Sequence, residues 1–244
     1  MRIRRNCWPH RAWERRRPVL EVKHISMHYR LRGRNGGSVQ ALDDISLTVK
    51  DGETVALMGE SGSGKSTLVR LICAFEKPTA GSVFWDGTDI FALARKRTLY
   101  KTVQPVFQDN LNCFDPRQKI KKSLFEPLRN YYRLSEKECA EKLLPLLTAA
   151  DIPEYLLEKY PHELSGGQQK RICIIRALSV APKLVILDEA TAGLDPTVML
   201  HILELLKRLQ TETGCAYLFI THDFSAASFM TETIVSIKAG KIPA

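Results

Sequence analysis

The chain has 244 residues, of which 44% are hydrophobic and 26% charged, and it carries a formal net charge of +9. A chain of this length and composition can bury a sizeable core, which excludes a low-complexity or disordered protein. No apolar run approaches the roughly 18 residues needed to cross a bilayer, so we do not expect a membrane-embedded helix.

The basic residues are concentrated at the start of the chain. Seven arginines precede Pro18, namely Arg2, Arg4, Arg5, Arg11, Arg15, Arg16 and Arg17. We expect residues 1–18 to form a basic, poorly ordered leader, because charge runs of this kind are usually solvated tails. The alternative is a contact with anionic lipid or nucleic acid, for which the interleaved Trp8 and Trp13 are suited. The segment lacks the apolar h-region of a signal peptide, so we do not expect export.

Apolar and alternating segments predict the elements that follow the leader. We predict strands at 19–30 and 41–50, joined by a hairpin loop at 32–38 that is rich in Gly, Arg and Asn. A short apolar strand at 54–58 then runs into a glycine-rich stretch, and a helix is predicted over 65–75. The buried side of this helix is predicted to consist of Leu68, Val69, Leu71, Ile72 and Phe75.

The glycine-rich stretch fits the pattern G-x-x-x-x-G-K-[ST] at every fixed position. It predicts binding of a nucleoside triphosphate by Gly59, Glu60, Ser61, Gly62, Ser63, Gly64, Lys65, Ser66 and Thr67. The glycines let backbone N–H groups point inward around the phosphates, and the following helix adds its N-terminal dipole. In such a loop Lys65 contacts the β- and γ-phosphates, Ser66 offers its hydroxyl to Mg²⁺, and Thr67 supports the α-phosphate side.

The middle of the chain differs in character. After a further strand at 82–86, the region from about 108 to 165 combines helix signals with prolines at its bends. Ser135 is suited to cap a helix, because Glu138 follows three residues later. We therefore predict an α-helical subdomain inserted into an α/β core.

A second glycine-containing turn opens a helix after this region. It consists of Leu164, Ser165, Gly166, Gly167 and Gln168. Ser165 can cap the helix, while Gly166 and Gly167 would leave backbone N–H groups available to a phosphate. An ordinary capped helix start also explains the local sequence, so the turn gains functional weight only together with the motifs around it.

An apolar strand at 184–188 ends in two acids, Asp188 and Glu189. At the carboxyl edge of a parallel sheet, Asp188 could hold Mg²⁺ and Glu189 could polarise an attacking water. Without the glycine loop upstream, a solvated charge pair would explain these acids equally well. A helix at 198–210 and strands at 217–221 and 233–238 complete the prediction.

In this order and spacing, the glycine loop, the pentapeptide 164–168 and the acidic strand end resemble the nucleotide-binding subunit of an ATP-binding cassette (ABC) transporter. The resemblance covers residues 19 to 240 and implies an α/β fold. The implied fold is a P-loop NTPase core of the ABC ATPase type, with an antiparallel β subdomain and an inserted α-helical subdomain. It also implies an ATPase domain over 19–244 and two cassettes arranged head to tail around two ATP molecules. Binding of ATP would close such a pair and hydrolysis would reopen it.

The resemblance assigns roles to residues that no local pattern would single out. It implies that Tyr29 stacks on adenine, the alternative being a core aromatic, and that Asp195 crosses the dimer interface. It implies catalytic roles for Glu189, for His222 at the γ-phosphate, and for Gln108 near Mg²⁺ and the attacking water. The pentapeptide would contact the ATP of the opposite subunit. The implied Mg²⁺ ligands are Ser66, Gln108 and Asp188.

The sequence after Gln108 narrows the subfamily. Residues 106–109 and 114–117 resemble the corresponding region of ATPases from dipeptide, oligopeptide and nickel importers, although Asn110 and Asp115 depart from the usual pattern. We therefore expect a subunit that hydrolyses ATP to power import of a peptide or of nickel or a metal chelate.

This expectation includes partners and a location. They are two membrane permease subunits, a second ABC ATPase that is a different chain, and indirectly an extracytoplasmic solute-binding protein. The chain would lie peripherally at the cytoplasmic face of the membrane, and no nucleic acid is expected. Two alternatives remain open: a non-transport ABC ATPase that acts on nucleic acid or ribosomes through the arginine-rich leader, and an exporter ATPase of similar build.

Overall fold

The computed structural model describes residues 18–30, 37–95, 98–108 and 113–243. The leader before Pro18, most of the predicted loop 32–38, and Asp109 and Asn110 lie outside these ranges. The strands are β1 (Pro18–Arg30), β2 (Ser38–Lys50), β3 (Thr54–Met58), β4 (Ala80–Trp85), β5 (Thr88–Asp89), β6 (Val103–Val106), β7 (Leu184–Asp188), β8 (Ala216–Thr221) and β9 (Ile234–Ser236). The α-helices are α1 (Lys65–Ile72), α2 (Ile90–Arg95), α3 (Leu99–Thr102), α4 (Ile120–Tyr132), α5 (Glu136–Ala149), α6 (Gly166–Ser179), α7 (Pro196–Thr213) and α8 (Phe224–Met230). Two 3₁₀ helices, η2 (Glu154–Glu158) and η3 (Pro161–Glu163), precede α6.

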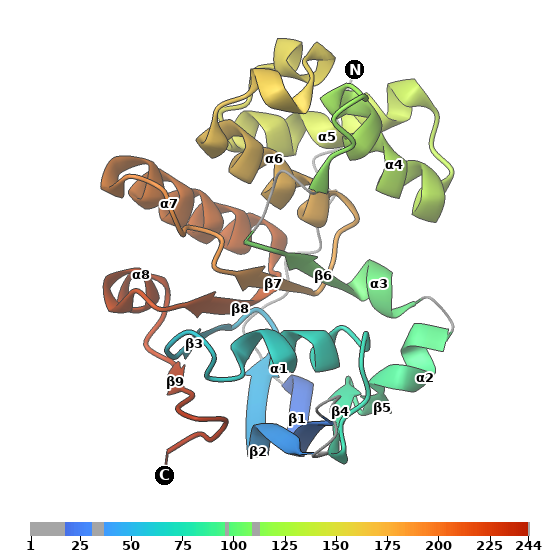
Figure 1. Ribbon diagram of the computed structural model, residues 1–244. Helices are drawn as coiled ribbons and strands as arrows, with labels where there is room; N and C mark the ends of the chain where they lie inside the picture. Colours follow the sequence, from blue (N-terminus) through green and yellow to red (C-terminus); the bar gives the residue numbers. More distant parts are fainter. Residues whose placement is uncertain (1–17, 31–36, 96–97, 109–112, 244) are drawn as a thin grey trace.

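A parallel sheet in the order β6-β7-β8-β3-β9 forms the centre of the molecule (Figure 1). Its register aligns the carboxyl ends of the strands: Met58 pairs with Thr221, and Val106 pairs with Leu187. Because these ends meet at one edge, the segments that follow β3, β6, β7 and β8 all start from the same side of the sheet. Those segments contain the P-loop, Gln108, Glu189 and His222.

The two faces of this sheet belong to two hydrophobic cores. Alternate residues of β7 divide between them, with Val185 and Leu187 in one core and Leu184 and Ile186 in the other. The first core extends into helices α4 to α8, and the second into β1, β2 and α1. Burial on both faces explains the nearly continuous apolar sequence of β7 and β8, since a parallel sheet covered by other elements has no polar face.

A four-stranded antiparallel sheet, in the order β2-β1-β4-β5, lies below the parallel sheet in Figure 1. The long strand β1 pairs with both β2 and β4, and Tyr29 lies opposite Val39 near its end. The alternation of apolar and polar residues in β1 and β2 fits a sheet with one buried face. This is the predicted antiparallel subdomain, and its edge brings Tyr29 beside α1.

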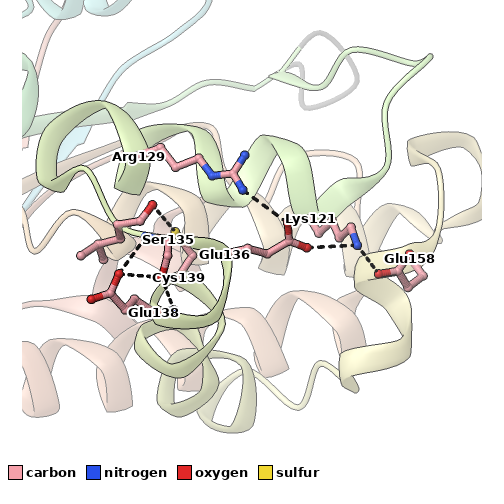
Figure 2. Close-up of polar contacts among 8 residues, drawn as sticks. Lys121, Arg129, Ser135, Glu136, Glu138, Cys139 and Glu158 are labelled. Atoms are coloured by element: carbon pink, nitrogen blue, oxygen red, sulfur yellow. Dashed lines mark hydrogen bonds and ion pairs between the residues drawn. The ribbon is translucent and has the colours of Figure 1, made fainter.

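The predicted helical insertion is present at the top of Figure 1, where α4, α5 and the first part of α6 pack together. Ser135 and Glu138 form the predicted capping box at the start of α5. Figure 2 shows how charged side chains join α4, α5 and η2: the Nζ atom of Lys121 lies 3.4 Å from Glu136 and 2.8 Å from Glu158. In the described part of the chain, none of the helices has the length and apolarity that crossing a membrane requires.

One predicted boundary is wrong. The first helix was predicted over 65–75 with Phe75 on its buried side, but α1 ends at Ile72 and Phe75 is 54% exposed. Ala74 adopts a left-handed conformation with φ of 55°, which ends the helical path before Phe75 can return to the core. The Phe75 ring instead stacks on Tyr100, with the ring centroids 6.5 Å apart.

Candidate active site

The glycine loop joins β3 to α1 as predicted. Gly62 and Gly64 have φ values of 78° and 106°, in the left-handed region that favours glycine. Gly64 occupies the position before α1, and no side chain caps this helix. The first turn of α1 therefore keeps backbone N–H groups for another acceptor, and an anion such as a phosphate suits them electrostatically.

Lys65 is held inside the loop that precedes it. Its side chain is buried, and its Nζ atom donates hydrogen bonds to the carbonyl oxygens of Gly59, at 2.7 Å, and Glu60, at 2.9 Å. These bonds compensate for removing an ammonium group from water. They also fix a positive charge at the centre of the loop, where phosphate oxygens would be bound.

The P-loop packs closely against the backbone of two other segments, one at Ala41 and one at residues 237–240. A side-chain carbon at Gly59 would collide with the carbonyl oxygen of Ile237, and one at Gly64 would lie 2.6 Å from the carbonyl oxygen of Ala41. The backbone N–H of Gly240 donates to the Ser63 carbonyl oxygen at 3.1 Å. The shape of the P-loop is thus fixed by contacts within the chain.

The Asp188 carboxylate lies at the carboxyl end of β7, within the electrostatic influence of the P-loop. Burial raises the pKa of Asp188, the neighbouring Glu189 raises it further, and the Lys65 ammonium lowers it. The electrostatic influence of Lys65 places the predicted acid near the predicted P-loop lysine. Two adjacent carboxylates in a half-buried position also create a demand for positive charge.

Glu189 and His222 face each other across the ends of β7 and β8. The Nδ1 atom of His222 lies 3.6 Å from Oε1 of Glu189, and the Glu189 side chain is 20% exposed. The backbone N–H of Glu189 donates to the Ile220 carbonyl oxygen at 3.0 Å, although its φ of 47° is unusual for a residue with a side chain. Left-handed backbone held by neighbouring contacts is frequent at functional sites, and here it directs a carboxylate toward the sheet edge.

Gln108 follows β6 at the same edge and is exposed. Its carbonyl oxygen accepts a hydrogen bond of 3.0 Å from the Nζ atom of Lys170, a buried residue on α6. This hydrogen bond therefore links α6, the helix that follows the pentapeptide, to Gln108 at the start of the segment after β6. This contact connects the helical subdomain to the α/β core at the predicted site.

The pentapeptide opens α6 with a complete capping box. Ser165 Oγ accepts from the Gln168 N–H at 3.3 Å, and the Ser165 N–H donates to Oε1 of Gln168 at 2.9 Å. Gly166 and Gly167 line a cavity of about 620 Å³ together with Asp195. The structure thus brings the pentapeptide and Asp195 to the same cavity, while their place at a dimer interface remains a prediction.

Tyr29 and Asp195 each make contacts within the chain. Tyr29 is half-buried against the core that includes α1, and its hydroxyl donates to a carboxylate oxygen of Glu76. The Asp195 side chain caps α7 by accepting from the N–H groups of Thr197, at 3.1 Å, and Val198, at 3.0 Å. These contacts explain both side-chain types structurally, so their roles toward ATP remain predictions.

Sequence reasoning missed two residues that tie these motifs together, Lys170 and Glu76. Lys170 lies in an otherwise apolar stripe with Cys173, Ile174 and Ala177, and this pattern could have marked it as a buried lysine with a partner. Glu76 carries no such signal, because it follows the end of α1 and meets Tyr29 only through the fold.

The sequence pattern of one protein family, described as ABC transporter, matches residues 42–192. The chain belongs to the ABC transporter family. It is 40% identical over 228 residues to the nickel import ATP-binding proteins NikE of Escherichia coli (strain K12) and Shigella sonnei (strain Ss046). Each alignment covers 92% of this chain and 85% of the relative.

Solved ABC cassettes have the same fold as this ABC ATPase. The ATP-binding cassette MJ0796, in a dimeric post-hydrolysis state bound to ADP and Pi, aligns with a TM-score of 0.81 and 33% identity over 93% of this chain and 97% of that one. The protein cbiO1 from Clostridium perfringens, part of the transporter complex cbiONQ, aligns with a TM-score of 0.81 and 31% identity over 93% of this chain and 87% of that one. The predicted fold class and the predicted ATPase activity in transport are confirmed.

Some of the predicted site residues lie within the range that matches the family, and others lie outside it. The P-loop, Gln108, the pentapeptide and the acids Asp188 and Glu189 lie within residues 42–192, whereas Tyr29, Asp195 and His222 lie outside that range. The roles of these three residues toward ATP remain predictions.

Proposed function

We propose that this ABC ATPase powers import of nickel, a metal chelate or a peptide through separate membrane permeases. The observation that carries the proposal is the 40% identity, over 92% of the chain, to proteins named for nickel import. The sequence around Gln108, which resembles that of peptide and nickel importers, supports the same class.

The geometry of the site supports a division of labour in hydrolysis. The P-loop, residues 59–67, would cradle the phosphates, with Lys65 neutralising charge on the β- and γ-phosphates. Glu189 would polarise the attacking water, and His222, whose ring lies 3.6 Å from Glu189, would orient this carboxylate and contact the γ-phosphate. Gln108 would couple nucleotide binding at the site to the position of the helical subdomain, through the hydrogen bond between its carbonyl oxygen and Lys170.

The residues at the sheet edge are chemically suited to Mg²⁺. Ser66, Gln108 and Asp188 offer hydroxyl, amide and carboxylate oxygens, which are the donors that Mg²⁺ prefers. Burial and then the neighbouring Glu189 raise the pKa of Asp188, and a divalent cation would oppose both effects by stabilising the charged carboxylate. When bound with ATP, Mg²⁺ supplies charge neutralisation at the β- and γ-phosphates.

The working assembly in this proposal contains a second cassette. The glycines of the pentapeptide border a cavity at the surface of the chain, where the ATP of an opposite subunit could approach the start of α6. We propose that the second cassette is a different ABC ATPase, and that the pair binds two permeases at the cytoplasmic face of the membrane. An extracytoplasmic solute-binding protein would deliver the solute to the permeases.

Affinity purification from detergent-solubilised membranes tests this assembly. The tagged Glu189→Gln variant should bind ATP without hydrolysing it and should accumulate the closed pair. Lys65→Ala is the matched control, because it removes the P-loop charge but leaves Glu189 in place. We expect ATP-dependent recovery of two permeases and a second cassette with Glu189→Gln, and loss of the ATP dependence with Lys65→Ala.

Uptake of radioactive nickel and of labelled dipeptides by cells with and without the Glu189→Gln variant then tests the solute class. A fall in uptake of one of these solutes would support the importer proposal. Recovery of the tagged protein with ribosomes or nucleic acid, and with no membrane protein, would contradict it.

A further inference from the structure

The end of β1 is fastened to the segment that follows the P-loop helix. The backbone N–H of His28 donates to Thr79 Oγ1 at 3.0 Å, and the N–H of Thr79 donates to the Ser26 carbonyl oxygen at 2.9 Å. These bonds fix the backbone around Tyr29 relative to the turn that carries Glu76. The main chain therefore places the two side chains next to each other.

The Tyr29 hydroxyl lies between two polar groups of this region. It donates a hydrogen bond to Oε2 of Glu76, and the side chain of Thr67, the last residue of the P-loop motif, lies near enough to lower its pKa. The pKa of Tyr29 is raised, first by burial and then by the bond to Glu76. The tyrosine thus stays protonated and donates its proton toward the glutamate.

Glu76 is itself held in place by a cation. Its second carboxylate oxygen, Oε1, lies 3.2 Å from Nη1 of Arg70, and its side chain is 29% exposed. Arg70 follows Thr67 by three residues on α1, so both lie on the same side of the helix. The hydroxyl of Tyr29 is therefore linked through Glu76 to Arg70, on the helix that begins at the P-loop.

An aromatic ring that stacks on a nucleotide base loses torsional freedom when the base binds. A hydrogen bond that already fixes the ring removes part of this entropic penalty, and a charged acceptor makes such a bond stronger than a neutral one. Anchoring through the hydroxyl leaves the two ring faces uninvolved in the bond. A ring held in this way would present the same face to each incoming base.

We propose that Glu76, oriented by Arg70, is the positioning residue that sets the Tyr29 ring for binding of the adenine base. This inference rests on the proposed stacking role of Tyr29. Under this proposal, Glu76 strengthens the part of the ATP affinity that comes from contacts with the adenine base. The phosphate-dependent part, which the P-loop provides, should be independent of Glu76.

Binding of ATP and of inorganic tripolyphosphate to the purified full-length chain, measured by calorimetry, separates these two parts. Glu76→Ala and Tyr29→Phe each remove the same hydrogen bond, so each should raise the Kd for ATP by about 3- to 10-fold. The double variant should show no further increase, because the two residues act through one contact. The Kd for tripolyphosphate should remain unchanged in all three.

Two further variants serve as controls. Glu76→Gln keeps an acceptor oxygen and should restore most of the ATP affinity that Glu76→Ala loses. Glu158→Ala removes a carboxylate that is also paired with lysines but lies in the helical subdomain, so it should leave both Kd values unchanged. Thermal melts of each variant show whether it is folded.

Tyr29→Ala separates failure of this inference from failure of the proposed base site. If Tyr29→Ala weakens ATP binding and Glu76→Ala does not, the positioning role of Glu76 is wrong and the stacking role of Tyr29 stands. If Tyr29→Ala leaves ATP binding unchanged, both are wrong. Tighter ATP binding by Glu76→Ala, or equal weakening of ATP and tripolyphosphate, would overturn the inference as well.

Discussion

The P-loop and the pentapeptide 164–168 both contain glycines, but the surroundings of these glycines differ. At the P-loop, a side chain at Gly59 or Gly64 would collide with backbone atoms of the same chain. At the pentapeptide, a side-chain carbon built at Gly166 meets no atom of the described residues within 4 Å, apart from its chain neighbours and the backbone of its own helix. Gly59 and Gly64 are therefore required by the fold itself. The space at Gly166 is open within the chain, so a side chain there is compatible with the fold, and the proposed approach of a phosphate from an opposite subunit is what a side chain would obstruct.

The two helices that follow these turns differ in the same way. No side chain caps α1, whereas Ser165 and Gln168 form a capping box at the start of α6. The first helix leaves its N-terminal N–H groups to a ligand, while the second is stable as a helix before any ligand is considered. The comparison predicts that changes at the P-loop affect folding and binding together. Substitution of Gly166 in the pentapeptide should affect activity alone, because the capping box at Ser165 and Gln168 is left intact.

Gly64→Ala should have the largest effect. The new methyl group would lie 2.6 Å from the Ala41 carbonyl oxygen, and the φ of 106° is unfavourable for alanine. Strain and steric overlap together should destabilise the protein by about 3 kcal/mol and abolish ATP binding. Thermal denaturation and ATP calorimetry measure the two effects, and an unchanged melting temperature would show that the loop can relax.

Gly166→Ala should lower ATPase activity without destabilising the chain. The methyl group has room within the chain, but it would obstruct a phosphate that approaches the start of α6. We expect about a 100- to 1,000-fold loss of ATPase activity in the assembled transporter, because a lost contact to the reacting phosphate has effects of this size. ATP binding to the isolated chain should not change. A loss of stability similar to that of Gly64→Ala would contradict the comparison.

Two matched helix caps separate stability from function at the pentapeptide. Ser165→Ala and Ser135→Ala each remove the serine of a capping box, and each should destabilise the protein by about 1 kcal/mol. Only Ser165→Ala should also lower the ATPase rate, since Ser135 lies at the start of α5 in the helical subdomain (Figure 2). Melting temperatures and phosphate release of the two variants test this, and equal activity losses would remove the special role of Ser165.

The smallest effect is expected in the charged network of Figure 2. Hydrogen bonds from Lys119 and then from Lys121, the second of which Figure 2 shows, lower the pKa of Glu158 from 4.5 to about 2. Because the folded-state pKa is lowered, the stabilisation is present above pH 4.5 and is lost as the pH falls toward 2. Glu158→Gln should slightly lower the melting temperature at pH 7, and the difference should shrink on acidification. ATPase activity should not change.

Prediction from the sequence succeeded where a short motif specifies the structure and failed where the backbone turns without a sequence signal. The P-loop residues 59–67, the capping box at Ser135 and the strand ending at Asp188 were all found from short patterns. The prediction for Phe75 was wrong because hydrophobic spacing continues past the point where Ala74 turns the backbone. Turn geometry at a residue other than glycine leaves no clear trace in the sequence.

The sequence by itself determined the family, the nucleotide-binding loop and the order of the elements, because each depends on residues close together in the chain. The tertiary structure decided which of these motifs meet. Asp188 comes under the influence of Lys65, Glu189 faces His222, and Lys170 reaches Gln108 only after the parallel strands align their carboxyl ends. The same holds for Tyr29 and Glu76, which are 47 positions apart and share a hydrogen bond. Such contacts depend on strand register and helix packing, which no short stretch of sequence specifies.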